Sequence, residues 1–158
     1  MAPWRLPPRA KVFEAFTAVA DGRVQLTGPG SATVVSSGGD KTYDVEWSAD
    51  GRSITANDNA SYWQGYLGYP ILAVLLERGE LHADSDAVSA MAGVPWHDLN
   101  RRYRRDYDAA VAHALGALKE HVVDPALVER QVDDVLDQIA ALDLRREGRG
   151  RRPPSVKG

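Results

Sequence analysis

The side chains best suited to a binding site stand together in one short stretch, from Asn57 to Tyr69. Aromatic rings lie there beside amides and a carboxyl, which suits the wall of a pocket for a small polar ligand or a peptide. The same rings are close to helical spacing and could instead cover a sheet as part of the core. The candidate ligand-binding residues are Asn57, Asp58, Asn59, Tyr62, Trp63, Gln64, Tyr66 and Tyr69.

Motifs for catalysis and metal binding are missing from the sequence. No two histidines have the spacing of the His-Glu-x-x-His zinc motif. A calcium loop beginning at Asp58 would need glycine at its sixth position and glutamate at its twelfth, where this chain has Trp63 and Tyr69. We therefore expect no cofactor, no metal and no catalytic residue, and an enzyme is the less favoured class. The histidines are His82, His97, His113 and His121, with His121 expected in the last turn of its helix.

Residues 84–107 resemble the helix-turn-helix of bacterial transcription regulators, with a short helix, a Gly-Val turn at Gly93 and a second helix. The resemblance implies that arginines of the second helix reach phosphates or guanine edges. Trp96 and Asp98 occupy the start of that helix, where DNA readers place their base contacts, and a solvated helix face explains the arginines equally well. The residues proposed for nucleic-acid binding are Arg101, Arg102, Arg105, Arg149, Arg151 and Arg152.

Charge is distributed unevenly along the 158 residues. The net charge is −3, yet the segment Arg145–Gly158 holds six basic residues and one acidic residue, so the rest of the chain is acidic. Such a basic tail could hold nucleic acid, an anionic membrane or an acidic partner. The chain has no cysteine and no apolar run near the ~18 residues of a membrane span. These features favour a cytoplasmic protein.

Hydrophobic periodicity divides the chain into a sheet part and a helical part. Lys41–Ser48 alternates apolar and polar residues, which predicts a strand with one buried face. Apolar residues at three- and four-residue steps predict a helix over residues 10–20 and a long helix from Pro95 to Val122. The run after Pro70, residues 71–78, is apolar on nearly every side, so we expect it to be the buried central helix.

The predicted fold class is therefore α+β: an N-terminal helix, a three- to four-stranded antiparallel meander, the buried central helix and a C-terminal antiparallel helical pair. The predicted boundaries are an extended lead-in over 1–9, one domain over 10–144 with its sheet in 23–56 and its helices in 61–144, and a disordered tail over 145–158. The helical pair could also dock on its own copy, which predicts a homodimer. The favoured function is a non-catalytic interaction or ligand-binding module of bacterial type, with an unidentified protein or small-molecule partner.

Overall fold

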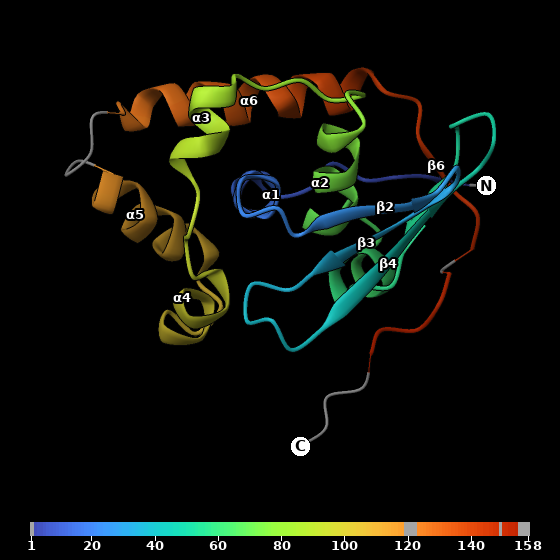
Figure 1. Cartoon of the computed structure of the whole chain (residues 1–158), viewed down its shortest axis with the longest axis horizontal. Coiled ribbons are helices and arrows are strands. Elements are labelled where there is room, and N and C mark those ends of the chain that lie inside the picture. The colour runs from blue at the N-terminus through green and yellow to red at the C-terminus, as the bar shows by residue number, and fades with distance from the viewer. Residues whose placement is uncertain (1, 119–122, 149, 155–158) are drawn as a thin grey trace.

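A four-stranded antiparallel sheet forms one side of the molecule (Figure 1). Its strands follow chain order, as predicted for a meander. Val34 and Val45 are both fully buried because their face of the sheet meets the helices. The strands are β2 (Val24–Gly28), β3 (Ser31–Val35), β4 (Thr42–Trp47) and β5 (Ile54–Ala56).

Two buried helices lie behind the sheet. Helix α2 (Tyr69–Glu77) packs directly on the strands, and its residues from Pro70 to Leu75 are all buried, as the apolar run predicted. Helix α1 (Arg9–Ala20) packs on the other side of α2 and also contacts α3, α5 and α6. Because helices surround it, α1 also buries the charged residues Lys11 and Glu14.

The remaining helices of the described residues end with the long C-terminal helix α6. They are η1 (Ala60–Gln64), α3 (Ser85–Ala90), α4 (Trp96–Arg102), α5 (Tyr107–Leu118) and α6 (Pro125–Ala141). Asp84 and Asp124 cap α3 and α6 by accepting hydrogen bonds from backbone amides two residues later. Helix α6 buries a stripe spaced by three and four residues and packs on α1, α3 and α5.

The long helix predicted from Pro95 to Val122 is wrong, because the chain breaks it into α4 and α5. The break is a turn over residues 103–106, in which Arg104 and Arg105 have backbone φ angles of 52° and 65°. The apolar spacing continued through the turn because residues of both helices face α1, although the helices follow different directions.

The two chain ends meet beside the sheet. Strand β1 (Ala2–Pro3) pairs antiparallel with β6 (Arg145–Arg146), so ordered pairing extends into the segment that composition predicted to be a disordered tail. The computed structural model describes residues 2–118, 123–148 and 150–154. His121 and Arg149 lie outside the described residues. None of the helices in these described ranges has the combination of length and hydropathy needed to cross a membrane.

Candidate functional site

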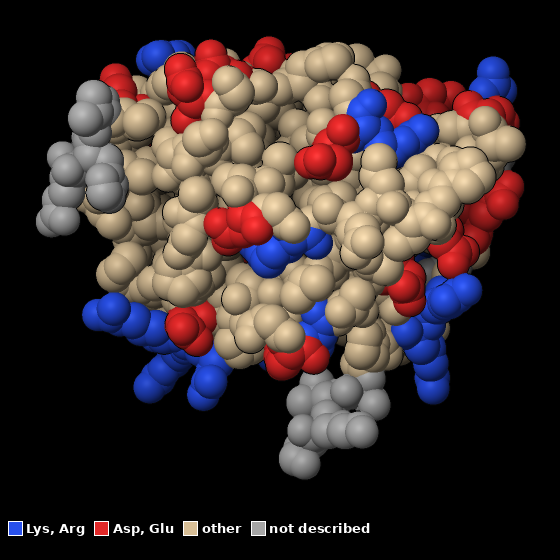
Figure 2. All heavy atoms as spheres, in the orientation of Figure 1, with Lys and Arg blue, Asp and Glu red and all other residues tan. Residues whose placement is uncertain are grey.

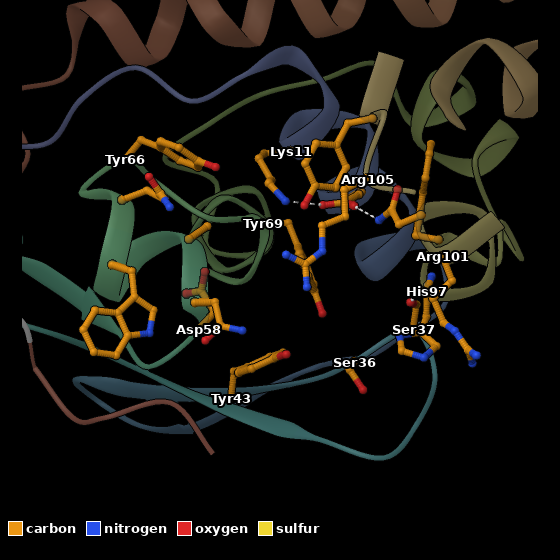
Figure 3. A pocket seen from close by; sticks show the side chains of 18 of the residues that line it. Lys11, Ser36, Ser37, Tyr43, Asp58, Tyr66, Tyr69, His97, Arg101 and Arg105 are labelled. Atoms are coloured by element: carbon orange, nitrogen blue, oxygen red, sulfur yellow. Dashed lines mark hydrogen bonds and ion pairs between the residues drawn. The ribbon is translucent and has the colours of Figure 1, made fainter. Parts of the chain in front are cut away.

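A cavity of about 730 Å³ opens between the sheet side and the helical side of the molecule. Figure 3 shows Asp58, Tyr43 and Tyr66 towards one side of it and His97 and Arg101 towards the other. Its other lining residues come from α1, the position before β2, the loop after β3, η1 and its flank, the first residue of α2, α4, the α4–α5 turn and the first residue of α5. They are Lys11, Glu14, Arg23, Ser36, Ser37, Asn59, Ala60, Trp63, Gln64, Tyr69, Trp96, Asn100, Arg104, Arg105 and Tyr107.

Six of the eight residues proposed for ligand binding line this cavity: Asp58, Asn59, Trp63, Gln64, Tyr66 and Tyr69. Asn57 instead joins η1 to the sheet, since its Oδ1 accepts a hydrogen bond from the Asp44 amide at 2.8 Å. Tyr62 stacks edge-on against Trp63, with ring centroids 4.6 Å apart. The stretch around η1 therefore both joins the sheet to α2 and forms one wall of the cavity.

Asp58 is the buried carboxyl of that wall. It is 5% exposed, and its Oδ2 accepts a hydrogen bond from the Ser61 amide at 3.1 Å at the start of η1. Gly68 makes room for it, because a Cβ on Gly68 would lie 2.0 Å from Asp58 Oδ2. Burial raises the pKa of Asp58, although the hydrogen bonds from Ser61 and the charge of Lys11 oppose that rise.

Tyr43 and Tyr69 stand beside Asp58 and keep their protons. Their rings meet edge-on with centroids 6.2 Å apart. Burial, and then the neighbouring phenol or the charge of Asp58, raises the pKa of both hydroxyls. Both phenols are therefore neutral hydrogen-bonding groups near neutral pH, and neither is an anion that would repel a negatively charged ligand.

A buried ion pair on α1 forms the floor of the cavity. Lys11 Nζ lies 3.3 Å from Glu14 Oε2 and 4.6 Å from the centre of the Tyr107 ring. Glu14 Oε1 accepts a hydrogen bond from Asn100 Nδ2 at 2.8 Å, which ties α4 to α1. Burial alone would lower the pKa of Lys11, but the attraction of Glu14 and the nearby tyrosines outweighs it, so the pKa is raised and Lys11 stays cationic.

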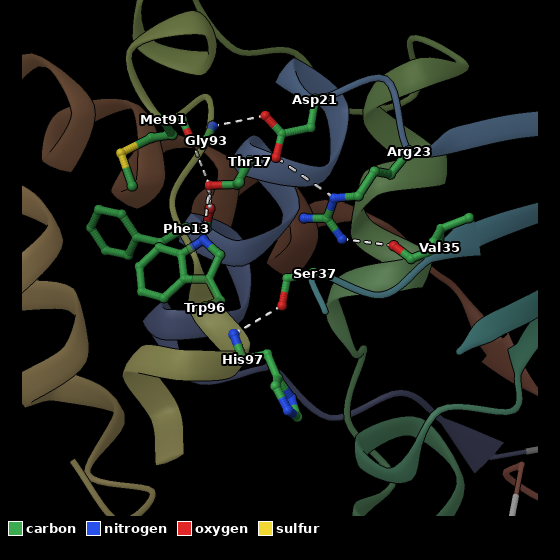
Figure 4. Close-up of polar contacts among 10 residues, drawn as sticks. All are labelled: Phe13, Thr17, Asp21, Arg23, Val35, Ser37, Met91, Gly93, Trp96 and His97. Carbon is green, nitrogen blue, oxygen red and sulfur yellow. Dashed lines mark hydrogen bonds and ion pairs between the residues drawn. The ribbon is translucent and has the colours of Figure 1, made fainter. Parts of the chain in front are cut away.

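Polar contacts hold the segment between α3 and α4 against α1 (Figure 4). The buried Thr17 hydroxyl donates to the Met91 carbonyl at 2.7 Å and accepts from Trp96 Nε1 at 2.8 Å. Asp21 accepts from the Gly93 amide, and the His97 amide donates to Ser37 Oγ at 2.9 Å. These contacts set the position of α4 relative to the sheet, and so determine where the following arginines lie.

Three arginines line the cavity from the helical side: Arg101 near the end of α4, and Arg104 and Arg105 in the α4–α5 turn. All three are exposed, and within the described residues their guanidinium groups form no hydrogen bond or ion pair. Figure 2 shows basic side chains projecting at the lower left, where α4 lies in Figure 1. Left-handed backbone at two successive non-glycine residues costs free energy, and such strain is found preferentially at functional sites.

The charge of the cavity is opposite in sign to that of the chain. Five basic residues line it, namely Lys11, Arg23, Arg101, Arg104 and Arg105, against the acidic Glu14 and Asp58. The whole chain carries −3. Because Glu14 already pairs with Lys11, the remaining positive charge lies mainly on arginines, whose planar guanidinium groups suit carboxylate and phosphate.

The arginines proposed for nucleic-acid binding fall into separate environments. Arg101 and Arg105 line the cavity, whereas Arg102 does not and lies over the Tyr103 ring at 5.7 Å. Arg151 lies across the sheet, with Nη2 3.1 Å from Glu46 and Nη1 3.8 Å from Asp44, and Arg152 is exposed. The described part of this set therefore does not form one continuous surface.

Sequence reasoning missed the cavity residues that lie far from η1. Lys11, Glu14, Arg23, Tyr43 and Asn100 belong to α1, the sheet and α4, and only the fold brings them together. A signal available in the sequence was the presence of the charged residues Lys11 and Glu14 within the predicted N-terminal helix. Among the described histidines, only His97 lines the cavity, and His113 bonds the Tyr103 hydroxyl. No cluster of three metal-ligating side chains occurs within the described ranges.

The fold and cavity define an α+β protein in which an aromatic wall faces a cationic one. Residues 4–145 match the family described as uncharacterised conserved protein UCP014422, and the chain belongs to that family. The match spans every residue that lines the cavity. No curated protein and no solved structure matches the chain.

Proposed function

We propose that this protein binds a small anionic molecule in the cavity between η1 and the α4–α5 turn. The observation that carries the proposal is the placement of Arg101, Arg104 and Arg105, which line the cavity without an ion pair among the described residues. Their charge is available to a ligand because no carboxylate of the described residues neutralises it. Charge-assisted hydrogen bonds from arginine to carboxylate or phosphate are about twice as strong as neutral ones.

The size and lining of the cavity support a small molecule. About 730 Å³ lies within the roughly 300–1,000 Å³ usual for ligand pockets. Tyr43, Tyr66 and Tyr69 supply apolar ring faces with polar tips, so they can contact the uncharged part of such a ligand. The proposal keeps the aromatic stretch as a binding wall and adds the arginines as the groups that select an anion.

Isothermal titration calorimetry with inorganic phosphate, pyrophosphate and citrate at low salt tests the proposal. We expect binding that weakens as salt rises, because free ions screen the partly exposed guanidinium groups. Replacing both Arg101 and Arg105 by alanine should lower affinity by at least about tenfold, since one charge-assisted hydrogen bond contributes about 1.5–3 kcal/mol.

Arg102→Ala is the matched control, because Arg102 is the neighbour of Arg101 on α4 and is also exposed but does not line the cavity. Its affinity for the bound anion should stay close to that of the unmodified protein, and all variants should keep the same circular dichroism spectrum. Failure of all three anions to bind at low salt, or equal losses in the control and the double variant, would contradict the proposal.

Nucleic-acid binding is the second candidate, and the exposure of four arginines between Arg101 and Arg105 favours it. Phosphate contacts predict that log affinity falls with log salt by about 0.9 for each phosphate neutralised on duplex DNA. Arg102→Ala discriminates between the two candidates. A nucleic acid lying along the exposed arginines would lose affinity with Arg102, whereas a small anion inside the cavity would not.

We also propose a cytoplasmic location, supported by the absence of cysteine from the sequence. The homodimer predicted through the C-terminal helices stays a prediction, and light scattering at several protein concentrations would test it. A constant mass of 17.2 kDa would contradict it.

A further inference from the structure

Three buried side-chain atoms of the cavity residues form no hydrogen bond within the described protein: Asp58 Oδ1, Asn100 Oδ1 and Arg23 Nε. Arg23 still has an electrostatic neighbour, since its Nε lies 3.7 Å from Asp21 Oδ2 and its Nη1 donates to the Val35 carbonyl. The two oxygens are different, because each is an acceptor that receives no hydrogen bond from the described residues. Buried polar atoms without partners are uncommon and therefore need an explanation.

The orientation of both acceptors is determined by their bonded neighbours. Asp58 uses Oδ2 to accept from the Ser61 amide, which leaves Oδ1 as the atom without a partner. Asn100 donates through Nδ2 to Glu14, and a carboxylate can only accept, so the amide cannot be flipped and its other atom is the oxygen. Both residues line the cavity, so a ligand in it is the natural source of donors.

The cavity therefore offers two kinds of complementary groups. Within the described residues, the helical side presents cations without anionic partners, and the buried residues Asp58 and Asn100 present acceptors without donors. An anion alone would satisfy the first set and leave the second unsatisfied. A molecule with an anionic group and a separate N–H donor would satisfy both sets.

We propose that the ligand is bipolar, with a phosphate or carboxylate at the α4–α5 turn and an amine or other N–H donor at Asp58. This inference rests on the anion-binding function proposed above and specifies the ligand class. Asp58 is the residue that selects the donor. Its carboxyl is held in place by the Ser61 amide and fits closely against Gly68. A carboxylate also attracts a cationic donor more strongly than an amide does.

Two matched pairs of probes test the proposal, again by calorimetry. The first pair compares ω-aminoalkyl phosphates with alkyl phosphates of the same chain length, from ethyl to hexyl. The second compares guanosine with inosine 5′-monophosphate, which differ by one exocyclic amine. We expect at least one pair to show at least about tenfold tighter binding of the amine. The pair that shows the preference tells whether the cavity binds an aliphatic ammonium or a nucleobase amine.

Asp58→Asn should reduce that preference to within about threefold. The amide oxygen must stay at the Oδ2 position to accept from the Ser61 amide, so the amide nitrogen replaces Oδ1 and presents a donor instead of an acceptor. Asp98→Asn, an exposed carboxyl of α4 that does not line the cavity, is the control and should keep the preference.

A second measurement uses the unmodified protein and does not depend on folding of the variant. The ¹³C carboxyl resonance of Asp58 should shift on titration with the preferred amine and not with its amine-free partner. The inference is overturned if neither pair prefers the amine, if Asp58→Asn keeps the preference, or if the Asp58 resonance responds equally to both probes. Binding of an amine probe that depends on Asp58 but is unchanged when both Arg101 and Arg105 are replaced by alanine would instead overturn the anion-binding function and leave Asp58 as a donor-selecting residue.

Discussion

Two arginine-rich segments of this protein differ in what their charges contact. In the C-terminal segment, Arg145 pairs with Asp143, Arg151 with Glu46 and Asp44, and Arg146 donates to the Tyr62 carbonyl at 2.7 Å. At the end of α4 and in the turn that follows it, Arg101, Arg104 and Arg105 have no such partners among the described residues. Clustered positive charge is therefore structural in one place and available to a ligand in the other, although composition alone makes the C-terminal segment look more basic.

The largest effect should come from Arg146→Ala. Arg146 donates to the carbonyl of Tyr62 in the middle of η1 and lies 5.0 Å from the centre of the Trp4 ring, so its loss frees the junction of both termini with η1. We expect a loss of about 2–3 kcal/mol in the free energy of unfolding, measured by urea denaturation. Arg152→Ala, at an exposed position of the same segment, should change stability little. Similar stabilities for the two variants would remove the contrast between the segments.

The pH dependence of stability tests Asp58, which lies on the opposite wall of the cavity from the arginines of the helical side. Because the folded-state pKa of Asp58 is raised, its contribution to stability is fully present below the unfolded pKa and is lost as pH rises through the folded pKa. Asp58→Asn should therefore gain stability relative to the unmodified protein as pH increases from about 4, by at most about 1.4 kcal/mol per pH unit. Parallel unfolding profiles for the two proteins would show that Asp58 titrates normally.

Arg104→Gly and Arg105→Gly should each stabilise the protein and weaken anion binding. Left-handed backbone costs a non-glycine residue about 1–2 kcal/mol, and the flexibility of glycine in the unfolded chain offsets part of that gain. A net gain of about 0.5–1 kcal/mol per substitution is expected from thermal or urea unfolding. Destabilisation would mean that the guanidinium groups support the fold, as those of the C-terminal segment do.

The smallest effect is expected from Arg151→Ala. Its side chain is 69% exposed and the side chains of its partners Asp44 and Glu46 are 41% and 50% exposed, so water and salt screen the pairs. Stability should fall by at most about 0.5 kcal/mol at low ionic strength, and by less at high salt. A loss as large as that of Arg146→Ala would show that the exposed end of the segment also holds the fold.

Local sequence signals determined most of the secondary structure. Alternation in Thr42–Trp47 defined β4, the spacing of Val128, Val132, Val135 and Ile139 defined the buried stripe of α6, and Asp124 before Pro125 marked its start. These features depend on residues within one or two turns, so they can be read from the chain directly. The position of six candidate ligand residues on the cavity wall was also predictable, because those residues lie within one short stretch.

Tertiary structure alone decided the rest of the site. The apolar spacing through Tyr103 and Tyr107 suggested one helix, and packing on α1 instead produced two helices joined by a strained arginine turn. The burial of the Lys11 and Glu14 side chains depends on the helices that pack around α1. Residues separated by more than forty positions meet in the cavity only when the layers pack, and the charge they share there, opposite to that of the chain, depends on this packing rather than on composition.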